Sequence, residues 1–152
     1  MNGFLAVDLG EGEFHFKASK EATSETVADF FTEIIGNYHH RGICSLEIFL
    51  DRNTTHKQKM QTLVANATAK FPIQVQFRLM PSYSPKINPT EYASHQIRLA
   101  ILHHADSRTS LQQFQTRIKE FCNRGTVFTK EQIVNLLGHM EQLILKFNNL
   151  SP

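Results

Sequence analysis

The sequence lacks tryptophan, has only two cysteines, and contains no long apolar run. A helix that spans a membrane needs about 20 consecutive apolar residues, so the pattern predicts no membrane segment. Cys44 and Cys122 are too few for a disulfide framework and are typical of a reducing compartment. The first residues have neither a basic lead nor a long apolar core, so we expect no signal peptide.

Charge is spread unevenly along the 152 residues, although the formal net charge is only +2. Residues 1–50 hold three basic and eight acidic residues, a balance of −5, whereas residues 51–152 hold the other 13 basic and six acidic residues, a balance of +7. Cations spaced along a surface attract polyanions because their binding releases condensed counterions. A nucleic-acid partner and a simply solvated basic face both agree with this pattern.

The hydrophobic pattern predicts an α/β fold of short strands and amphipathic helices. Four short apolar or alternating segments predict strands at 3–9, 13–18, 45–50 and 73–80. Gly10 and Gly12 predict a hairpin turn between the first two of these strands. Longer segments with helical spacing predict helices at 23–38, 54–71 and 91–104. Thr54 or Thr55 is expected to cap the second of these, and Ile97 and Ile101 to point inward from the third. Capping boxes predict two further helices, which begin at Thr109 with Gln112 and at Thr129 with Gln132.

The segment from residue 45 to residue 80 predicts a parallel strand–helix–strand crossover. Residues 45–50 (SLEIFL) are mostly apolar with little alternation, so we expect this strand to be covered on both faces. Asp51 follows the strand directly, at the carboxyl end where open α/β sheets bind their ligands. The pattern therefore marks Asp51 as a candidate metal ligand.

A second carboxylate, Glu91, follows a segment that holds three prolines between residues 81 and 89. Prolines stiffen this segment and exclude regular structure there, so we expect Glu91 to begin a helix at a fixed position. Two carboxylates, together with a third, can hold two Mg²⁺ ions for in-line phosphodiester displacement. The structural alternatives are a strand-end cap for Asp51 and an ordinary first-turn acid for Glu91.

The motifs Asp-x-x-x-x-His (Asp51, His56) and YSPKINPTE (residues 83–91) resemble the DDE transposase domain of the IS630/Tc1/mariner superfamily. The resemblance implies an RNase H-like mixed sheet flanked by helices, with a helical C-terminal extension. It also implies a site of three acids that cuts and joins DNA with Mg²⁺ or Mn²⁺, in which Asp51 is the second acid and Glu91 the third. His56 would support the strand end. The turn that delivers Glu91 would be shaped by Tyr83, Pro85, Asn88 and Pro89.

The first acid of the resembled site has two interpretations. The family's pattern maps residues 3–14 (GFLAVDLGEGEF) onto its second and third strands, which places the first strand and its aspartate upstream of Met1. The other interpretation makes Asp8 the missing acid, although Asp8 beside two glycines is also typical of a turn. The sequence departs from the family's usual pattern at Arg52 and Ser94, where asparagine and tryptophan are common.

The resemblance implies a transposase catalytic domain that cleaves and transfers DNA strands. Its core would be residues 1–105, truncated if the first strand lies upstream, with residues 106–152 as a helical cover. Without its first acid the chain would be inactive alone, as a remnant that binds DNA or forms a homodimer; a stand-alone RNase H-like nuclease would instead need Asp8. The expected location is cytoplasmic and nucleoid-associated in a bacterium. DNA phosphates would be contacted by Arg52, Lys57, Lys59, Lys86 and Arg98.

Overall fold

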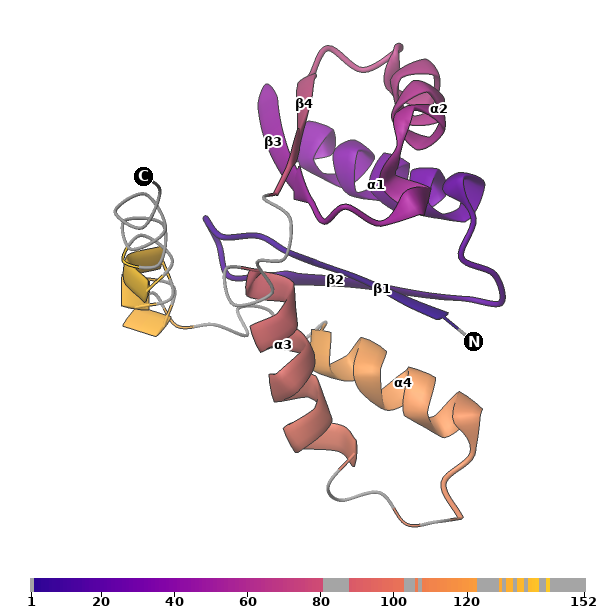
Figure 1. Ribbon diagram of the computed structural model, residues 1–152, viewed down its shortest axis with the longest axis vertical. Coiled ribbons are helices and arrows are strands. Elements are labelled where there is room, and N and C mark those ends of the chain that lie inside the picture. The colour runs from indigo at the N-terminus through magenta and orange to yellow at the C-terminus, as the bar shows by residue number, and fades with distance from the viewer. Residues whose placement is uncertain are drawn as a thin grey trace, which may run out of the picture. The chain divides into compact units, whose positions relative to one another are not determined.

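The computed structural model describes residues 2–80, 88–102, 106, 108–122, 129, 131–132, 134–135, 137–139 and 142. Its strands are β1 (Asn2–Val7), β2 (Phe14–Ser19), β3 (Ser45–Leu50) and β4 (Gln74–Leu79). Its main helices are α1 (Ser24–His40), α2 (Gln58–Thr68), α3 (Pro89–Ile97) and α4 (Leu111–Cys122), with a 3-10 helix η1 (Thr54–His56) and a π-helix η3 (Arg98–Leu102). Small sheets flanked by helices confirm the predicted α/β class and are consistent with an RNase H-like fold (Figure 1).

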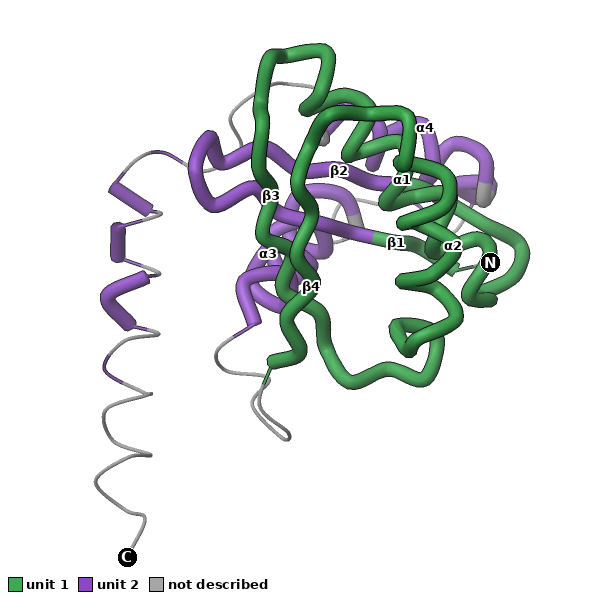
Figure 2. Tube along the Cα trace, turned by 90° about the horizontal axis from the view of Figure 1, so that it is seen from above, with its two compact units in different colours: residues 1–4, 17–84 green, residues 5–16, 85–152 purple. Residues whose placement is uncertain are grey.

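The chain divides into two compact units (Figure 2). The first unit comprises Met1–Phe4 and Lys17–Ser84, and the second comprises Leu5–Phe16 and Pro85–Pro152. The β1–β2 hairpin contributes residues to both units. The first unit holds β3, β4, α1 and α2, whereas the second holds α3, η3 and α4. The predicted division at residue 105 stays a prediction.

The β1–β2 hairpin turns where the two glycines predict it. Gly12 has a φ of 74°, a left-handed conformation that favours glycine. Its amide donates to the Asp8 carbonyl at 2.8 Å, and the Asp8 amide donates to the Glu13 carbonyl at 2.9 Å. The connection is too short for a parallel crossover, so the two paired strands run antiparallel.

Helix α1 supplies most of the apolar core of the first unit. Thr23 begins it with a capping box: the Thr23 hydroxyl accepts from the Thr26 amide at 3.3 Å, and the Thr26 hydroxyl accepts from the Thr23 amide at 3.0 Å. This confirms the predicted start of the helix. Its buried side chains recur at helical spacing and are Val27, Ala28, Phe30, Phe31, Ile34, Ile35 and Tyr38.

Strands β3 and β4 pair in parallel, in register from Ser45 opposite Gln74 to Leu50 opposite Leu79. Helix α2 connects them, which confirms the predicted crossover. Because side chains alternate along a strand, one face of the pair is apolar and carries Leu46, Ile48, Leu50, Val75, Phe77 and Leu79. The ring of Phe77 meets that of Phe31 at a centroid distance of 5.9 Å, so this face packs on α1.

The prediction that residues 45–50 are covered on both faces is wrong. Exposure alternates along β3, and Phe49 is 56% exposed whereas Leu50 is 2% exposed. Glu47 and Arg78 form an ion pair on the exposed face. Among the described residues β3 pairs with β4 alone. A short apolar run shows which side chains can be buried, but the number of layers that cover them depends on packing.

The helix predicted at 54–71 is shorter and broken. Its first turn is η1, and α2 begins only after Lys57, which occupies the N-cap position without a side-chain cap hydrogen bond. Phe71 lies beyond the end of α2 and stacks on His39 of α1 at a centroid distance of 5.0 Å. Neither of the predicted threonine caps begins α2.

The second unit has its own apolar core, which α3, η3, α4 and part of the hairpin build together. Its buried members are Phe14, Ala93, Ile97 and Ile101. The predicted inward positions Ile97 and Ile101 are thereby confirmed. Partly buried side chains complete the core: Leu5, Val7, Phe16, Phe114, Ile118 and Phe121.

Capping boxes also begin the later helical segments. Ser110, not the predicted Thr109, caps α4, because the Ser110 amide donates to the Gln113 side chain at 2.8 Å and the Gln113 amide donates to the Ser110 hydroxyl at 3.3 Å. The predicted box of Thr129 with Gln132 is confirmed by bonds of 2.8 and 3.1 Å. Of the helices within the described ranges, none has the length and apolar character that crossing a membrane requires.

Two isoleucines of the first unit test the packing of α1. Ile35 is 0% exposed and Ile43 is 40% exposed. We expect Ile35→Ala to lower the free energy of unfolding by about 2–5 kcal/mol, because it removes buried methyl groups and leaves a cavity. Ile43→Ala should lower it by less than about 1 kcal/mol. Urea denaturation followed by circular dichroism measures both, and equal losses would contradict the central position of α1.

Candidate functional site

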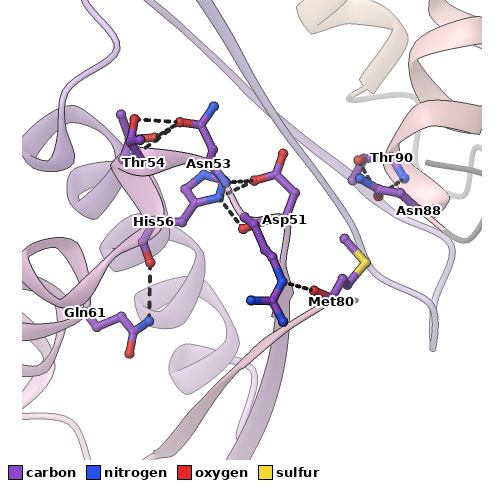
Figure 3. A network of polar contacts seen from close by, with 10 residues as sticks. Asp51, Asn53, Thr54, His56, Gln61, Met80, Asn88 and Thr90 are labelled. Carbon is purple, nitrogen blue, oxygen red and sulfur yellow. Dashed lines mark hydrogen bonds and ion pairs between the residues drawn. The ribbon is translucent and has the colours of Figure 1, made fainter. Parts of the chain in front are cut away.

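Asp51 follows β3 directly, at the carboxyl end where the sequence predicted it. Its Oδ1 accepts a hydrogen bond from the Asn53 amide at 3.1 Å. The Nδ1 nitrogen of His56 lies 2.6 Å from the same oxygen (Figure 3). Both contacts are made by Oδ1, so neither engages Oδ2. The side chain is 52% exposed, which leaves the carboxylate open to a ligand from solution.

The segment from Asp51 to His56 is held in its conformation by hydrogen bonds between its own residues. Asn53 caps η1, because its Oδ1 accepts from the Thr55 amide at 3.1 Å and from the Thr55 hydroxyl at 3.2 Å. The His56 carbonyl accepts from Gln61 Nε2 at 3.3 Å, which ties η1 to α2. The cap was predicted at the adjacent threonines and not at Asn53, although asparagine before a helix is itself a favoured cap.

His56 lies against the end of β3. Its Nδ1 forms a hydrogen bond of 3.3 Å with the Asp51 carbonyl in addition to the contact with the carboxylate. The imidazole is 19% exposed, and its edge faces the ring of Phe31 at a centroid distance of 6.4 Å. The histidine is therefore fixed between the acid and the core of the first unit.

Glu91 lies exposed in the first turn of α3. Asn88 caps this helix, since its Oδ1 accepts from the Thr90 amide at 3.0 Å and from the Thr90 hydroxyl at 2.6 Å. Pro89 occupies the first helical turn, where its missing N–H removes no intrahelical bond. The helix thus begins two residues before the predicted position. Three residues predicted to belong to the site lie outside the described residues: Tyr83, Pro85 and Lys86.

The two predicted acids belong to different units, Asp51 to the first and Glu91 to the second. In the part of the chain that the structure describes, no group of three or more His, Cys, Asp or Glu side chains is arranged to hold a metal ion. Each carboxylate supplies the oxygen ligands that Mg²⁺ and Mn²⁺ favour. A metal site that includes both Asp51 and Glu91 stays a prediction.

Asp8 shapes the hairpin turn. Its Oδ1 accepts from the Gly10 amide at 2.7 Å and from the Glu11 amide at 3.2 Å. A Cβ atom at position 10 would lie 3.2 Å from this oxygen, so glycine suits the close approach. These bonds support the interpretation of Asp8 as a turn residue, and its role as an acid of the site stays a prediction.

The basic residues predicted to contact DNA differ in their surroundings. Arg52 Nε donates to the Met80 carbonyl at 3.0 Å, which holds the guanidinium at the carboxyl ends of β3 and β4. Lys59 instead forms an ion pair with Glu25 at 2.5 Å. Arg52 is therefore the cation that the fold fixes next to Asp51. Two further basic residues are exposed, Lys57 in the first unit and Arg98 in the second.

A family model described as DDE superfamily endonuclease matches residues 1–112. The matched segment holds Asp8, Asp51, His56 and Glu91, and it covers well over half of the 152 residues. No curated protein matches the chain.

The ion pair with Lys59 lowers the pKa of Glu25 below its ordinary value, chiefly through the hydrogen bond from the ammonium group. Because the folded-state pKa is the lower one, ionised Glu25 favours folding above its unfolded-state pKa, and this contribution is lost as the pH falls through the folded-state value. We expect Lys59→Met to raise the pKa of Glu25 toward its ordinary value. An NMR titration of the side-chain carboxyl carbons measures the change.

The control for this titration is Lys70→Met, because the Lys70 ammonium lies over the Phe71 ring, 5.3 Å from its centroid. That variant should leave the Glu25 pKa unchanged. A Glu25 carboxyl that titrates identically with and without the Lys59 ammonium would show that the two side chains do not pair in solution.

Proposed function

The chain belongs to the DDE superfamily endonuclease family, and from this membership we propose that it is the catalytic domain of a transposase that cleaves and joins DNA strands. The Tyr-Ser-Pro and Asn-Pro-x-Glu elements within residues 83–91 support its assignment to the IS630/Tc1/mariner branch. The observation that carries the proposal is the placement of Asp51. It directly follows a parallel strand inside the matched segment and carries an exposed carboxylate.

Asp51 and Glu91 are the proposed ligands for Mg²⁺ or Mn²⁺, which nucleases of this family generally use. The fit of Asp51 rests on its chemistry and surroundings, since Oδ2 is not engaged by the turn that holds Oδ1. Glu91 offers a second exposed carboxylate at the start of a capped helix. When bound, such ions supply the Lewis acidity for in-line displacement at a phosphodiester. The protein's own contribution is to orient the two carboxylates.

Two sources of the first acid are proposed. One is Asp8, and the other is an aspartate on a strand supplied by a segment outside residues 1–152. The two hydrogen bonds that the Asp8 carboxylate accepts from turn amides favour the second source. With that source absent, the chain would be a transposase-derived remnant that binds DNA or forms a homodimer without cleaving DNA.

DNA is the proposed partner in either case. Family membership implies a DNA substrate, and the basic balance of residues 51–152 supports contact with phosphates. Arg52 has the strongest structural support among the proposed contacts, because its hydrogen bond to Met80 fixes it beside Asp51. The others are Lys57, Lys59, Lys86 and Arg98. The proposed location is the cytoplasm, in association with the nucleoid.

The catalytic proposal predicts nicking of supercoiled DNA that requires Mg²⁺ or Mn²⁺. Asp51→Asn and Glu91→Gln should each lower the nicking rate at least about 100-fold, because a catalytic metal ion contributes several kcal/mol to the transition state. Asp29→Asn and Glu120→Gln are matched controls on exposed helix positions and should leave the rate unchanged. Gel electrophoresis of plasmid DNA measures all four variants.

The outcomes separate the proposed sources of the first acid. Loss of nicking in Asp8→Asn as well would identify Asp8 as the first acid. Salt-sensitive DNA binding without nicking by the wild-type chain would instead support the remnant. Nicking that survives both Asp51→Asn and Glu91→Gln would refute the assignment of the acids.

The DNA-binding proposal predicts that Arg52→Ala weakens binding similarly for different DNA sequences. It should also reduce the slope of the logarithm of the binding constant against the logarithm of the salt concentration by about 0.9, the value for one lost phosphate contact. Fluorescence anisotropy with labelled duplex DNA measures the slope. Arg108→Ala is the control, because that guanidinium pairs with Asp106 at 3.1 Å. An unchanged slope in Arg52→Ala would contradict the phosphate contact.

A further inference from the structure

We infer that His56 is a positioning residue for Asp51: its Nδ1–H group holds Oδ1 of the carboxylate and so directs Oδ2 toward a metal ion. The inference rests on the proposed function, because it gives the Asp51 carboxylate a metal-binding role. It goes further by assigning a task to a side chain that does not itself bind the ion.

The distance between the two side chains identifies the donor. Nδ1 of His56 and Oδ1 of Asp51 are 2.6 Å apart. A carboxylate oxygen and an imidazole nitrogen approach this closely only with a proton between them, since both atoms otherwise present lone pairs. We therefore assign the proton of this hydrogen bond to Nδ1, with Oδ1 of the carboxylate as the acceptor.

The imidazole can position Asp51 because it is itself held. Its ring is 19% exposed and faces the buried ring of Phe31 edge-on, at an interplanar angle of 70°. Its main chain is held from the other side by the hydrogen bond from Gln61. Rotation of the imidazole would break its contact with the Phe31 ring. The donor is thereby anchored to the core of the first unit.

A second donor acts on the same carboxylate oxygen. The Asn53 amide reaches Oδ1 at 3.1 Å, so two groups on one short segment bind a single oxygen of Asp51 (Figure 3). With Oδ1 held at two points, the direction of Oδ2 is set before any ion arrives. Mg²⁺ demands near-ideal octahedral geometry, which a ligand of fixed direction meets more readily. A carboxylate side chain whose rotamer is already fixed also loses less conformational entropy when it binds the ion.

Two variants of His56 separate hydrogen bonding from packing. His56→Phe keeps an aromatic ring against Phe31 but removes the donor, whereas His56→Asn removes the ring but keeps an N–H near the position of Nδ1. Three-bond couplings of the Asp51 β-protons report whether the carboxylate occupies one rotamer. We expect one rotamer in the wild type and in His56→Asn, and rotamer averaging in His56→Phe. Amide spectra of each full chain verify that it is folded.

Mn²⁺ binding, followed by the electron paramagnetic resonance signal of the free ion, provides the second measurement. His56→Phe should weaken binding about 10-fold, as loss of a partner that orients a ligand typically does, and His56→Asn should recover most of this loss. The reverse order of the two variants would show that only packing matters and would overturn the inference. So would a single Asp51 rotamer in His56→Phe.

The proposed function fails on a different result. Mn²⁺ affinity that Asp51→Asn leaves unchanged would refute the proposed metal site itself. Affinity that is lost in Asp51→Asn but kept in His56→Phe would refute only the positioning role of His56.

Discussion

The parallel pairing of β3 with β4 is the constraint on which the candidate site depends. Because both strands run in the same direction, their carboxyl ends meet at one edge, where the Met80 amide donates to the Leu50 carbonyl at 2.8 Å. Asp51 and Arg52 leave β3 at this edge, and the Arg52 side chain returns to the Met80 carbonyl. An antiparallel pair would place the start of one strand beside the end of the other, and this bond between an arginine and a neighbouring strand end would be lost. The apolar face on α1 stabilises the pairing, and the polar edge carries the candidate site.

Hydrogen bonds within each unit hold the segment that carries the proposed acid of that unit. Asp51 is held by Asn53 and His56, which follow it within one short segment. Glu91 takes its place from the cap that Asn88 makes on Thr90. Local bonds of this kind lose little loop-closure entropy when they form. The Asp51 carboxylate and the helix turn that carries Glu91 are therefore each held by bonds within one unit.

The helix starts show how far the capping residues can be predicted from the sequence. Thr23 and Thr129 begin their helices as expected, and each has a side-chain partner three positions later. Ser110 caps α4 in place of the predicted Thr109. The sequence does not distinguish the two, because both carry a hydroxyl group and each has a glutamine three positions later. Asn53 was not predicted as the cap of η1 for a similar reason, since two threonines follow it and threonine is also a common cap. Where two adjacent residues could each cap a helix, only the path of the backbone decides which of them does so.

The sequence by itself determined the order of strands and helices, the parallel crossover, and the position of Asp51 at the end of a strand. These features follow from the spacing of apolar residues and from rules of chain connection that hold in any α/β protein. Only the tertiary structure decided that one face of β3 is exposed, that His56 turns to the Asp51 carboxylate, and that Lys59 pairs with Glu25. Each of these depends on which surfaces pack together and on the direction a side chain takes after packing. Hydrophobic periodicity specifies which residues can be buried, whereas the partner that a polar side chain finds is set by the neighbours that folding brings to it.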